Sequence, residues 1–512
     1  MEMQSYTPEM PQTNVESVGR VATLRHFRSA LSIGGQEIRL ANIVYPAALA
    51  TSIATWFFAI GSPLWLDETI SYWQTSGGFF QVWARQGLSF PAYPYILLAT
   101  RTLFGSSEFV LRLPSILAML AAAWVLFCSA REFFEADVAL ITTIVFCAYP
   151  TIVFAAIDAR PYAFGVLAVN CSILSLLRWT RTGSTAYSVL FGIAAASIFY
   201  FHYLFGVILV AFAAFLVTVK PGANKKFRRQ ITRASLASAL VMVPVVPRLI
   251  YLFRTSHSHV FSLPPTPNHL AFTFAPDHML PLFGVVALIA AAAGKMANPD
   301  HAPSRAGVAC LLFAIVPIAI LYGVSVSTSL HIFVERYQLV AVPGIALCWG
   351  LLLRCINSTA LRIAFCLAMV VLTAKAHFEA PSHGYTWKYA LEAANRNASS
   401  DGAPLLVCSD LPEADYQPIP SDPSTSGLFG QLSYYKVNSP VIPLPRVWNG
   451  EAKSQVHDFL ATATPARRRF LVVAFRASHL TIQRIAETAK DSYTAHTLGV
   501  WDDVSVVEYV PR

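Results

Sequence analysis

Charged residues are scarce in this sequence. Only 13% of its 512 residues are Asp, Glu, Lys or Arg, whereas 55% are hydrophobic. A soluble domain normally has about a quarter charged residues. The deficit argues against an ordinary soluble protein and indicates that lipid is the solvent for much of the chain.

Cysteine patterns and a signal peptide are also missing. The eight cysteines lack the spacing of metal ligands, and only Cys408 follows the last apolar segment, so neither a disulfide framework nor a thiolate metal site is expected. The polar, mildly basic N-terminus, up to about Arg39, lacks a compact apolar core followed by a small-residue cleavage site. We therefore interpret residues 1–40 as a cytoplasmic tail.

Long apolar segments are abundant. A helix needs about 17–25 mainly apolar residues to cross the hydrocarbon core of a bilayer. Eleven segments meet or approach this length, and away from their ends they contain no Asp, Glu, Lys or Arg. The expected fold is therefore an all-α polytopic membrane protein. The segments are 41–61, 108–130, 138–157, 161–177, 186–203, 204–219, 234–250, 279–294, 306–325, 337–353 and 360–376.

Basic loops predict the orientation, because short cytoplasmic loops carry an excess of Lys and Arg. Residues 220–233 contain six of them and should face the cytoplasm. Counting outward from this loop places the other basic junctions inside as well. The same count puts the first loop, residues 62–107, and everything after about residue 377 outside. Because the basic residues lie between apolar segments, a nucleic-acid partner is not expected.

The C-terminal part, residues 377–512, is slightly acidic and less apolar. Its apolar runs Pro404–Cys408 and Phe470–Phe475 predict strands, and Trp387–Asn395 and Ile482–Lys490 predict helices. This mixture indicates a soluble α/β domain on the outer side.

Residues 91–104 are apolar but too short to span, and Arg101 interrupts them. Treating them as a span would reverse every later loop and send the basic loop 220–233 outward. We therefore expect a helix that lies at the membrane interface or re-enters it on the outer side.

Acidic residues follow the first apolar segment in the sequence PLWLDETISYW. One interpretation of Asp67 and Glu68 is an ordinary helix start, since Asp commonly caps helices. The other is a general base. A carboxylate at a water–lipid boundary is partly desolvated, which favours its accepting a proton from an incoming hydroxyl or amine.

A second cluster lies in DARPY, between the third and fourth segments. Asp158 and Pro161 are typical of a helix-start turn. In a functional interpretation, Arg160 binds phosphate with its planar guanidinium group, Asp158 orients an acceptor or holds a cation, and Tyr162 is a further substrate contact.

Two more outer helix ends carry candidate residues. Glu335 and Arg336 form either a surface ion pair or a second cationic site, with Arg336 and Tyr337 as substrate contacts. His202, in YFHYLFG, is typical of an interfacial anchor, and a substrate contact is the alternative.

These segments together resemble the membrane glycosyltransferases of the GT-C superfamily. The likeness is closest to the bacterial dolichyl-phosphate-mannose-protein mannosyltransferase-like branch, which includes lipid A aminoarabinose transferases and Rgt-like galacturonosyltransferases. It covers roughly residues 41–376. It implies inverting transfer of a sugar from a polyprenyl-phosphate donor to a glycolipid, glycan or protein, at the outer face of the cell membrane. The segments that carry it are PLWLDETISYW, FPAYPYILL, SSEFVLRLPSILAML, DARPYAFGVL and ERYQLVAVPGIAL.

By this resemblance, Asp67 matches the essential first-loop aspartate and Asp158 the second-loop acidic residue. We expect Asp67 to be the base, with Glu68 as its support, and Arg160 and Arg336 to contact the donor phosphate. The chemistry agrees, because cations stabilise a phosphate that leaves an anomeric carbon.

One position departs from the family pattern. Many relatives carry a cation, often His or Lys, just before the proline of the short first-loop helix, where this chain has Phe90 before Pro91. Arg85, Arg101 or Arg160 must then replace that cation.

Other functions, and the binding of a metal ion at the site, stay open. A transporter or flippase for lipid-linked saccharides is the main alternative, although transporters commonly place ionisable residues near the bilayer midplane. A polymerase-like protein is another. No cofactor is expected with certainty. Asp67, Glu68 and Asp158 are candidate ligands of a divalent cation, which usually needs more oxygen atoms than these.

Overall fold

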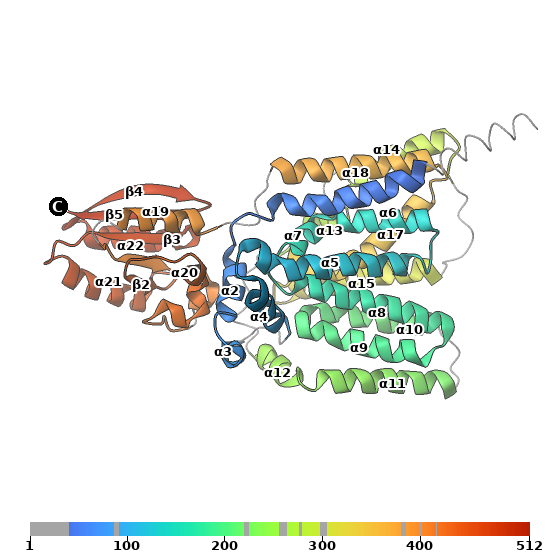
Figure 1. The fold of residues 1–512 in the computed structure, drawn as a ribbon, viewed down its shortest axis with the longest axis horizontal. Helices are drawn as coiled ribbons and strands as arrows, with labels where there is room; N and C mark the ends of the chain where they lie inside the picture. Colours follow the sequence, from blue (N-terminus) through green and yellow to red (C-terminus); the bar gives the residue numbers. More distant parts are fainter. Residues whose placement is uncertain are drawn as a thin grey trace, which may run out of the picture.

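The computed structural model describes residues 40–85, 92–219, 225–254, 264–275, 279–296, 305–379, 386–398, 402–415 and 417–512. The expected cytoplasmic tail and the Phe90–Pro91 position lie outside the described residues. The described chain forms a helical body and a smaller tail domain at one end of it (Figure 1).

Each of the eleven predicted segments is helical in the structure. Six correspond to helices long and apolar enough to cross a membrane, and three to helix pairs bent at a short break; of the described residues, six to nine spans therefore qualify. The two remaining segments form shorter apolar helices. The chain is thus a multi-pass helical membrane protein, as predicted. The long helices are Leu40–Ala59, α5 (Glu108–Ala130), α8 (Tyr162–Thr182), α15 (Arg305–Ser327), Glu335–Arg354 comprising α16 (Glu335–Gln338) and α17 (Val342–Arg354), and α18 (Thr359–Glu379).

The remaining helices of the body are bent pairs or short elements. The pair α6–α7 bends by 70°, as does the pair α11–α12. The bounds are α6 (Ala136–Cys147), α7 (Pro150–Ala156), α9 (Thr185–Phe201), α10 (Ile208–Val219), α11 (Lys225–Met242), α12 (Val246–Arg254), α13 (Pro267–Phe274) and α14 (Met279–Ala292).

The break between α6 and α7 has a local cause. Pro150 lacks a backbone N–H and therefore begins α7 instead of continuing α6. The indole N–H of Trp56 donates to the carbonyl of Cys147 at 2.9 Å, which satisfies a group exposed at the end of α6. The bend directs α7, and the DARPY segment that follows it, toward the end of the body that meets the tail domain.

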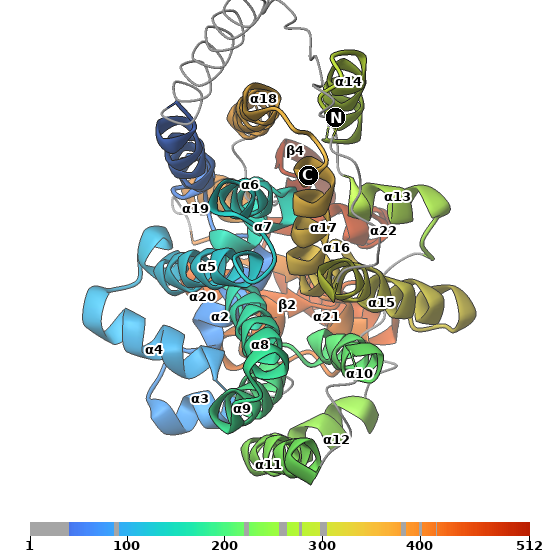
Figure 2. The ribbon, with the colours of Figure 1, turned by 90° about the vertical axis from the view of Figure 1, so that its right-hand side faces the viewer.

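Three short helices lie at that end: α2 (Leu66–Gln74), α3 (Phe79–Arg85) and α4 (Tyr93–Phe104). Seen along the body, helices such as α9, α11 and α18 are viewed nearly end-on, whereas α4 is seen from the side (Figure 2). The predicted short helix at 91–104 therefore exists, with the direction expected of an interfacial helix.

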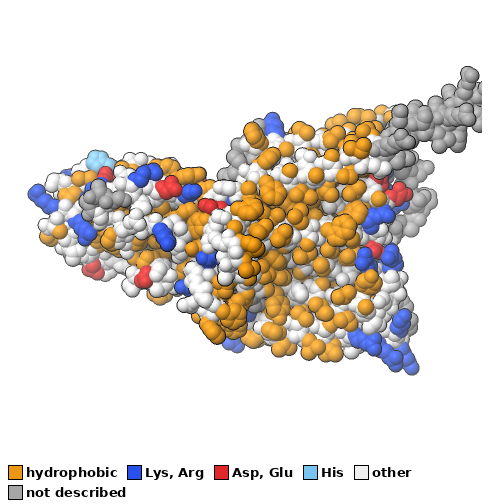
Figure 3. All heavy atoms as spheres, in the orientation of Figure 1, with side chains coloured by type: hydrophobic (Ala, Val, Ile, Leu, Met, Phe, Trp, Pro, Cys, Tyr) orange, Lys and Arg blue, Asp and Glu red, His pale blue; other side chains and the backbone are white. Residues whose placement is uncertain are grey.

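Side chains on the molecular surface differ between the two parts. On the face shown in Figure 3, hydrophobic side chains cover the helical body, while Lys and Arg gather at its end away from the tail domain. The tail domain displays mixed charges. This distribution agrees with a body that lies in lipid.

The tail domain is built on a five-stranded sheet with the order β2-β1-β3-β5-β4. β1 is parallel to β2 and β3, whereas β5 is antiparallel to β3 and β4. The predicted strands correspond to β1 and β3, and the α/β prediction is confirmed. The strands are β1 (Leu405–Cys408), β2 (Val441–Leu444), β3 (Phe470–Phe475), β4 (Tyr493–Trp501) and β5 (Val504–Pro511).

Helices cover both faces of this sheet. Leu405 and Val407 of β1 pack in one cluster with α19 (Lys388–Ala398), and Leu406 packs in a second cluster with α21 (Gly450–Ala463) and α22 (His479–Ala489). The alternation follows from the two-residue period of a strand. A further short helix, α20 (Gly430–Tyr434), contacts α2 and connects the tail domain to the body.

Candidate active site at the start of α2

Helix α2 presents its two acidic residues to different surroundings. Adjacent residues of a helix point about 100° apart. The Glu68 side chain is fully buried, whereas that of Asp67 is 17% exposed. Of the two carboxylates, that of Asp67 is therefore the one that solvent reaches.

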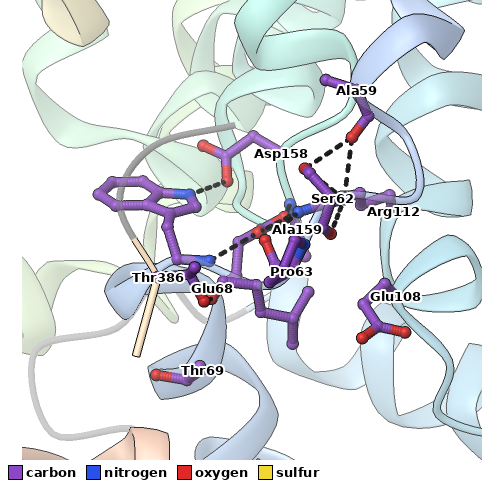
Figure 4. A network of polar contacts seen from close by, with 12 residues as sticks. Ala59, Ser62, Pro63, Glu68, Thr69, Glu108, Arg112, Asp158, Ala159 and Thr386 are labelled. Atoms are coloured by element: carbon purple, nitrogen blue, oxygen red, sulfur yellow. Dashed lines mark hydrogen bonds and ion pairs between the residues drawn. The ribbon is translucent and has the colours of Figure 1, made fainter. Parts of the chain in front are cut away.

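Glu68 joins three segments of the body (Figure 4). Arg112 of α5 donates to both oxygens of its carboxylate, from Nε to Oε1 at 2.8 Å and from Nη2 to Oε2 at 2.6 Å. The amide of Ala159 donates to Oε1 at 2.9 Å, and the amide of Trp65 donates to Oε2 at 3.2 Å. This carboxylate is committed to internal contacts, which hold the start of α2 against α5 and the DARPY segment.

Arg112 also fixes the turn that leads into α2. Its Nη1 group donates to the carbonyls of Ile60 and Ser62, each at 2.8 Å, and its Nη2 group to the carbonyl of Pro63 at 3.2 Å. The sequence analysis assigned Arg112 no role. The signal was present, because a charged residue inside an apolar helix is costly and normally has a dedicated partner.

Asp158 lies behind the site instead of at its surface. It is fully buried, and its Oδ1 accepts a hydrogen bond from the indole of Trp65 at 3.1 Å (Figure 4). The Trp65 ring packs edge-on against Phe154 of α7. Asp158 thus orients the residue that precedes α2.

Asp67 meets two arginines from distant segments. Its Oδ2 lies 3.4 Å from Nη1 of Arg336, at the start of α16, and 3.9 Å from Nη2 of Arg160, before α8. Arg160 also donates to the backbone carbonyl of Asp67 at 3.2 Å. The two arginine side chains are 34% and 22% exposed. One carboxylate and two guanidinium groups leave a net positive charge that suits an anionic ligand.

The other predicted substrate contacts form an aromatic layer beside these arginines. The His202 ring lies 5.4 Å from the ring of Tyr162 and 5.0 Å from that of Tyr337. His202 and Tyr162 are buried, while Tyr337, next to Arg336, is half-buried. In this arrangement Tyr337 is the ring nearest the surface, and the rings of His202 and Tyr162 are buried behind it.

Arg85 and Arg101 lie at the other end of α2. Arg85 donates to the carbonyls of Trp73, at 2.9 Å, and Ser76, and its guanidinium group lies over the Trp73 ring. Arg101 donates to the carbonyl of Tyr72 at 2.9 Å and stacks on that ring. Both cap the helix C-terminus, so of the three candidate replacements for the family's cation, Arg160 is the one beside Asp67.

The described residues contain no group of three or more His, Cys, Asp and Glu side chains placed to hold a metal ion. Glu68 and Asp158 each have polar protein partners. Of the three proposed metal ligands, Asp67 is the one whose carboxylate is partly exposed, beside Arg160 and Arg336.

Comparison with known proteins supports the fold. Residues 89–251 match the model of the family described as dolichyl-phosphate-mannose-protein mannosyltransferase. The match includes Asp158, Arg160, Tyr162 and His202 and begins after Asp67. A search of curated proteins found no match.

Two solved structures share the architecture over nearly their whole length. ArnT from Cupriavidus metallidurans bound to undecaprenyl phosphate is 14% identical, with a TM-score of 0.55, over 90% of this chain and 97% of ArnT. Its apo structure is 13% identical, with a TM-score of 0.51, over 94% and 98%. At this identity the similarity establishes the fold, and the predicted GT-C resemblance is confirmed.

Proposed function

We propose that this chain, which has the fold of GT-C membrane glycosyltransferases, transfers a sugar from a polyprenyl-phosphate donor to an acceptor at the outer face of the membrane. Asp67 is the general base, and Arg160 and Arg336 bind the donor phosphate. The observation that carries the proposal is the convergence of these three side chains from separate segments at the end of the body that meets the tail domain.

The reaction needs one base and a stabilised leaving group. Asp67 takes the proton of the acceptor hydroxyl or amine while that atom attacks the anomeric carbon. The bond from that carbon to the phosphate oxygen breaks, and the electron pair leaves with the phosphate. Arg160 and Arg336 stabilise the charge that develops there. A single displacement inverts the anomeric centre and uses no second carboxylate, which suits a site where Glu68 is tied to Arg112.

The arginines retain hydrogen-bonding capacity for a phosphate. Their distances to Asp67, 3.4 and 3.9 Å, exceed the roughly 2.7–2.9 Å of a tight charge-assisted hydrogen bond. The buried Nε atoms of Arg160 and Arg336 have no hydrogen-bond partner among the described residues. A guanidinium group offers a planar set of donors that matches phosphate oxygens.

Two further observations support the donor and the side of the membrane. ArnT, which shares the fold, was solved with undecaprenyl phosphate bound. Lys and Arg side chains gather at the end of the helical body away from the tail domain (Figure 3), whereas α2, which carries Asp67, lies at the end that meets this domain (Figure 1). By the positive-inside rule, the basic end is the cytoplasmic one.

The test uses purified protein in lipid vesicles with a labelled polyprenyl-phosphate sugar and a panel of acceptors. Asp67→Asn should lower the rate of transfer by about 100-fold or more, because general-base catalysis contributes about 10²–10⁴-fold. Binding of the polyprenyl phosphate should persist.

Asp137→Asn is the matched control. Asp137 is also a partly exposed carboxylate paired with an arginine, Arg362, at 2.7 Å, but it lies at the start of α6. Transfer by Asp67→Asn at the control rate would overturn the base assignment. Movement of donor across the vesicle without transfer would support a flippase instead.

A further inference from the structure

The turn before α2 is held by the tail domain. The hydroxyl of Tyr435 accepts a hydrogen bond from the amide of Leu64 at 2.6 Å and donates to the carbonyl of the same residue at 3.3 Å. Thr386 donates to that carbonyl at 3.3 Å and forms an isolated β-bridge with Trp65. Leu64 is fully buried, so its backbone groups need such partners.

The segment of the tail that ends at Tyr435 also runs along α2. We call residues 423–435 the tail strap. Within it, the carbonyl of Ser424 accepts a hydrogen bond from the indole of Trp73 at 2.9 Å. A Cβ atom on Gly430 would lie 3.1 Å from the backbone N and Cα of Ile70. Glycine therefore permits a closer approach of the strap to the helix than any other residue.

An apolar cluster reinforces this contact. Tyr434 and Tyr435 pack against buried side chains that include Leu64, Leu97 of α4 and Leu111 of α5. Burial raises the pKa of Tyr435, so its hydroxyl stays protonated and can donate to Leu64. The strap thus contacts the turn before α2, the middle of the helix and its last turn.

We propose that the tail strap positions Asp67, with Tyr435 and Gly430 as positioning residues, so that the tail domain completes the active site. Asp67 lies in the first turn of α2, and its distance to Arg160 and Arg336 depends on where this helix starts. The inference rests on the proposed function, because it takes Asp67 as the base.

The first test compares two adjacent tyrosines in the full chain. Tyr435→Phe keeps the ring and removes the hydroxyl that holds Leu64. Tyr434→Phe is the matched control, because the hydroxyl that it removes donates to the carbonyl of Ser106 at 3.2 Å and not to Leu64. Tyr435→Phe should lower kcat about tenfold, since a small misplacement of a catalytic group is costly, while the KM for donor stays unchanged. Tyr434→Phe should stay within about twofold of the natural protein.

The second test compares two glycines. Gly430→Ala places a methyl group against the backbone of Ile70 and should lower kcat severalfold, with Gly430→Val lowering it further. Gly450→Ala is the control, because among the described residues no neighbouring part of the structure lies within 4 Å of its added Cβ. Hydrogen exchange of residues 64–69 should accelerate in Tyr435→Phe and Gly430→Ala and stay unchanged in both controls. Exchange of the tail sheet reports that the domain is still folded.

The outcomes separate this inference from the proposed function. If Asp67→Asn abolishes transfer while Tyr435→Phe and Gly430→Ala behave like their controls, the strap has no positioning role and the proposed function stands. If Asp67→Asn transfers normally, the proposed function fails and so does the positioning of a catalytic base.

Discussion

Each end of α2 is contacted by a pair of arginines from other segments, and the two pairs have different partners. At the N-terminal end, Arg160 and Arg336 approach the carboxylate of Asp67 at 3.9 and 3.4 Å and remain partly exposed. At the C-terminal end, Arg85 and Arg101 donate to backbone carbonyls and stack on aromatic rings of α2.

The difference follows from the polarity of a helix. The last carbonyls of a helix have no partner within it and carry partial negative charge, so they bind cations. Arg85 and Arg101 meet this need and stabilise the loop. The arginines at the first turn face a side chain instead, and a ligand can compete for them. One short helix thus separates structural cations from those that we expect to bind substrate.

The largest effect, a loss of folding stability, should come from breaking the buried Glu68–Arg112 pair at the N-terminal end of α2. Glu68→Ala leaves Arg112 buried without its carboxylate, and losing one partner of a buried ion pair costs about 3–5 kcal/mol. Chemical or thermal unfolding in detergent measures this loss in the free energy of unfolding. The control, Glu487→Ala, removes an exposed partner of Arg484 and should cost about 0.5 kcal/mol or less. Equal losses in the two variants would show that the Glu68 network does not stabilise the body.

The next effect distinguishes the exposed cations. Arg336→Ala and Arg160→Ala should each lower kcat/KM for the donor about 100-fold, because each removes a charge that stabilises the leaving phosphate. Arg336→Lys should recover only part of the activity, since lysine lacks the planar set of donors. Initial rates at varied donor concentration provide the measurement. Activity near that of the natural protein would remove the two arginines from the proposed mechanism.

The smallest effect is expected at the opposite end of the helix. Arg101→Ala should cost about 1 kcal/mol of stability, the contribution typical of a cation at a helix C-terminus, and leave the KM for donor unchanged. Unfolding and donor titration are measured on the same preparation. A KM that rises as much as in Arg336→Ala would mean that Arg101, and not Arg160, replaces the family's first-loop cation.

Much of the body was predictable from local sequence. Apolar length predicted the eleven helical segments, and one of them is broken at Pro150 into two helices that bend by 70°. The candidates Asp67, Arg160 and Arg336 came from charged residues next to apolar segments, a pattern visible within about ten residues of each. The structure brings these three together, although their roles stay predictions.

The partners of Glu68, Arg85 and Arg101 were not predictable in the same way. Sequence analysis placed Glu68 with Asp67 because they are adjacent, and Arg85 and Arg101 with the phosphate because of their charge. The structure pairs Glu68 with Arg112, 44 residues away, and gives both loop arginines to backbone carbonyls. Neither result is encoded in the spacing of the residues.

The sequence by itself determined that this is a multi-pass helical membrane protein with an α/β tail, because hydropathy and periodicity are local properties that each segment carries alone. Only the tertiary structure decided which of two adjacent carboxylates is buried, which arginines remain partly exposed, and that Tyr435, 371 residues from Leu64, holds the turn before α2. Those outcomes depend on which donors and acceptors reach one another when distant segments pack, and a buried polar group takes the partner that packing supplies.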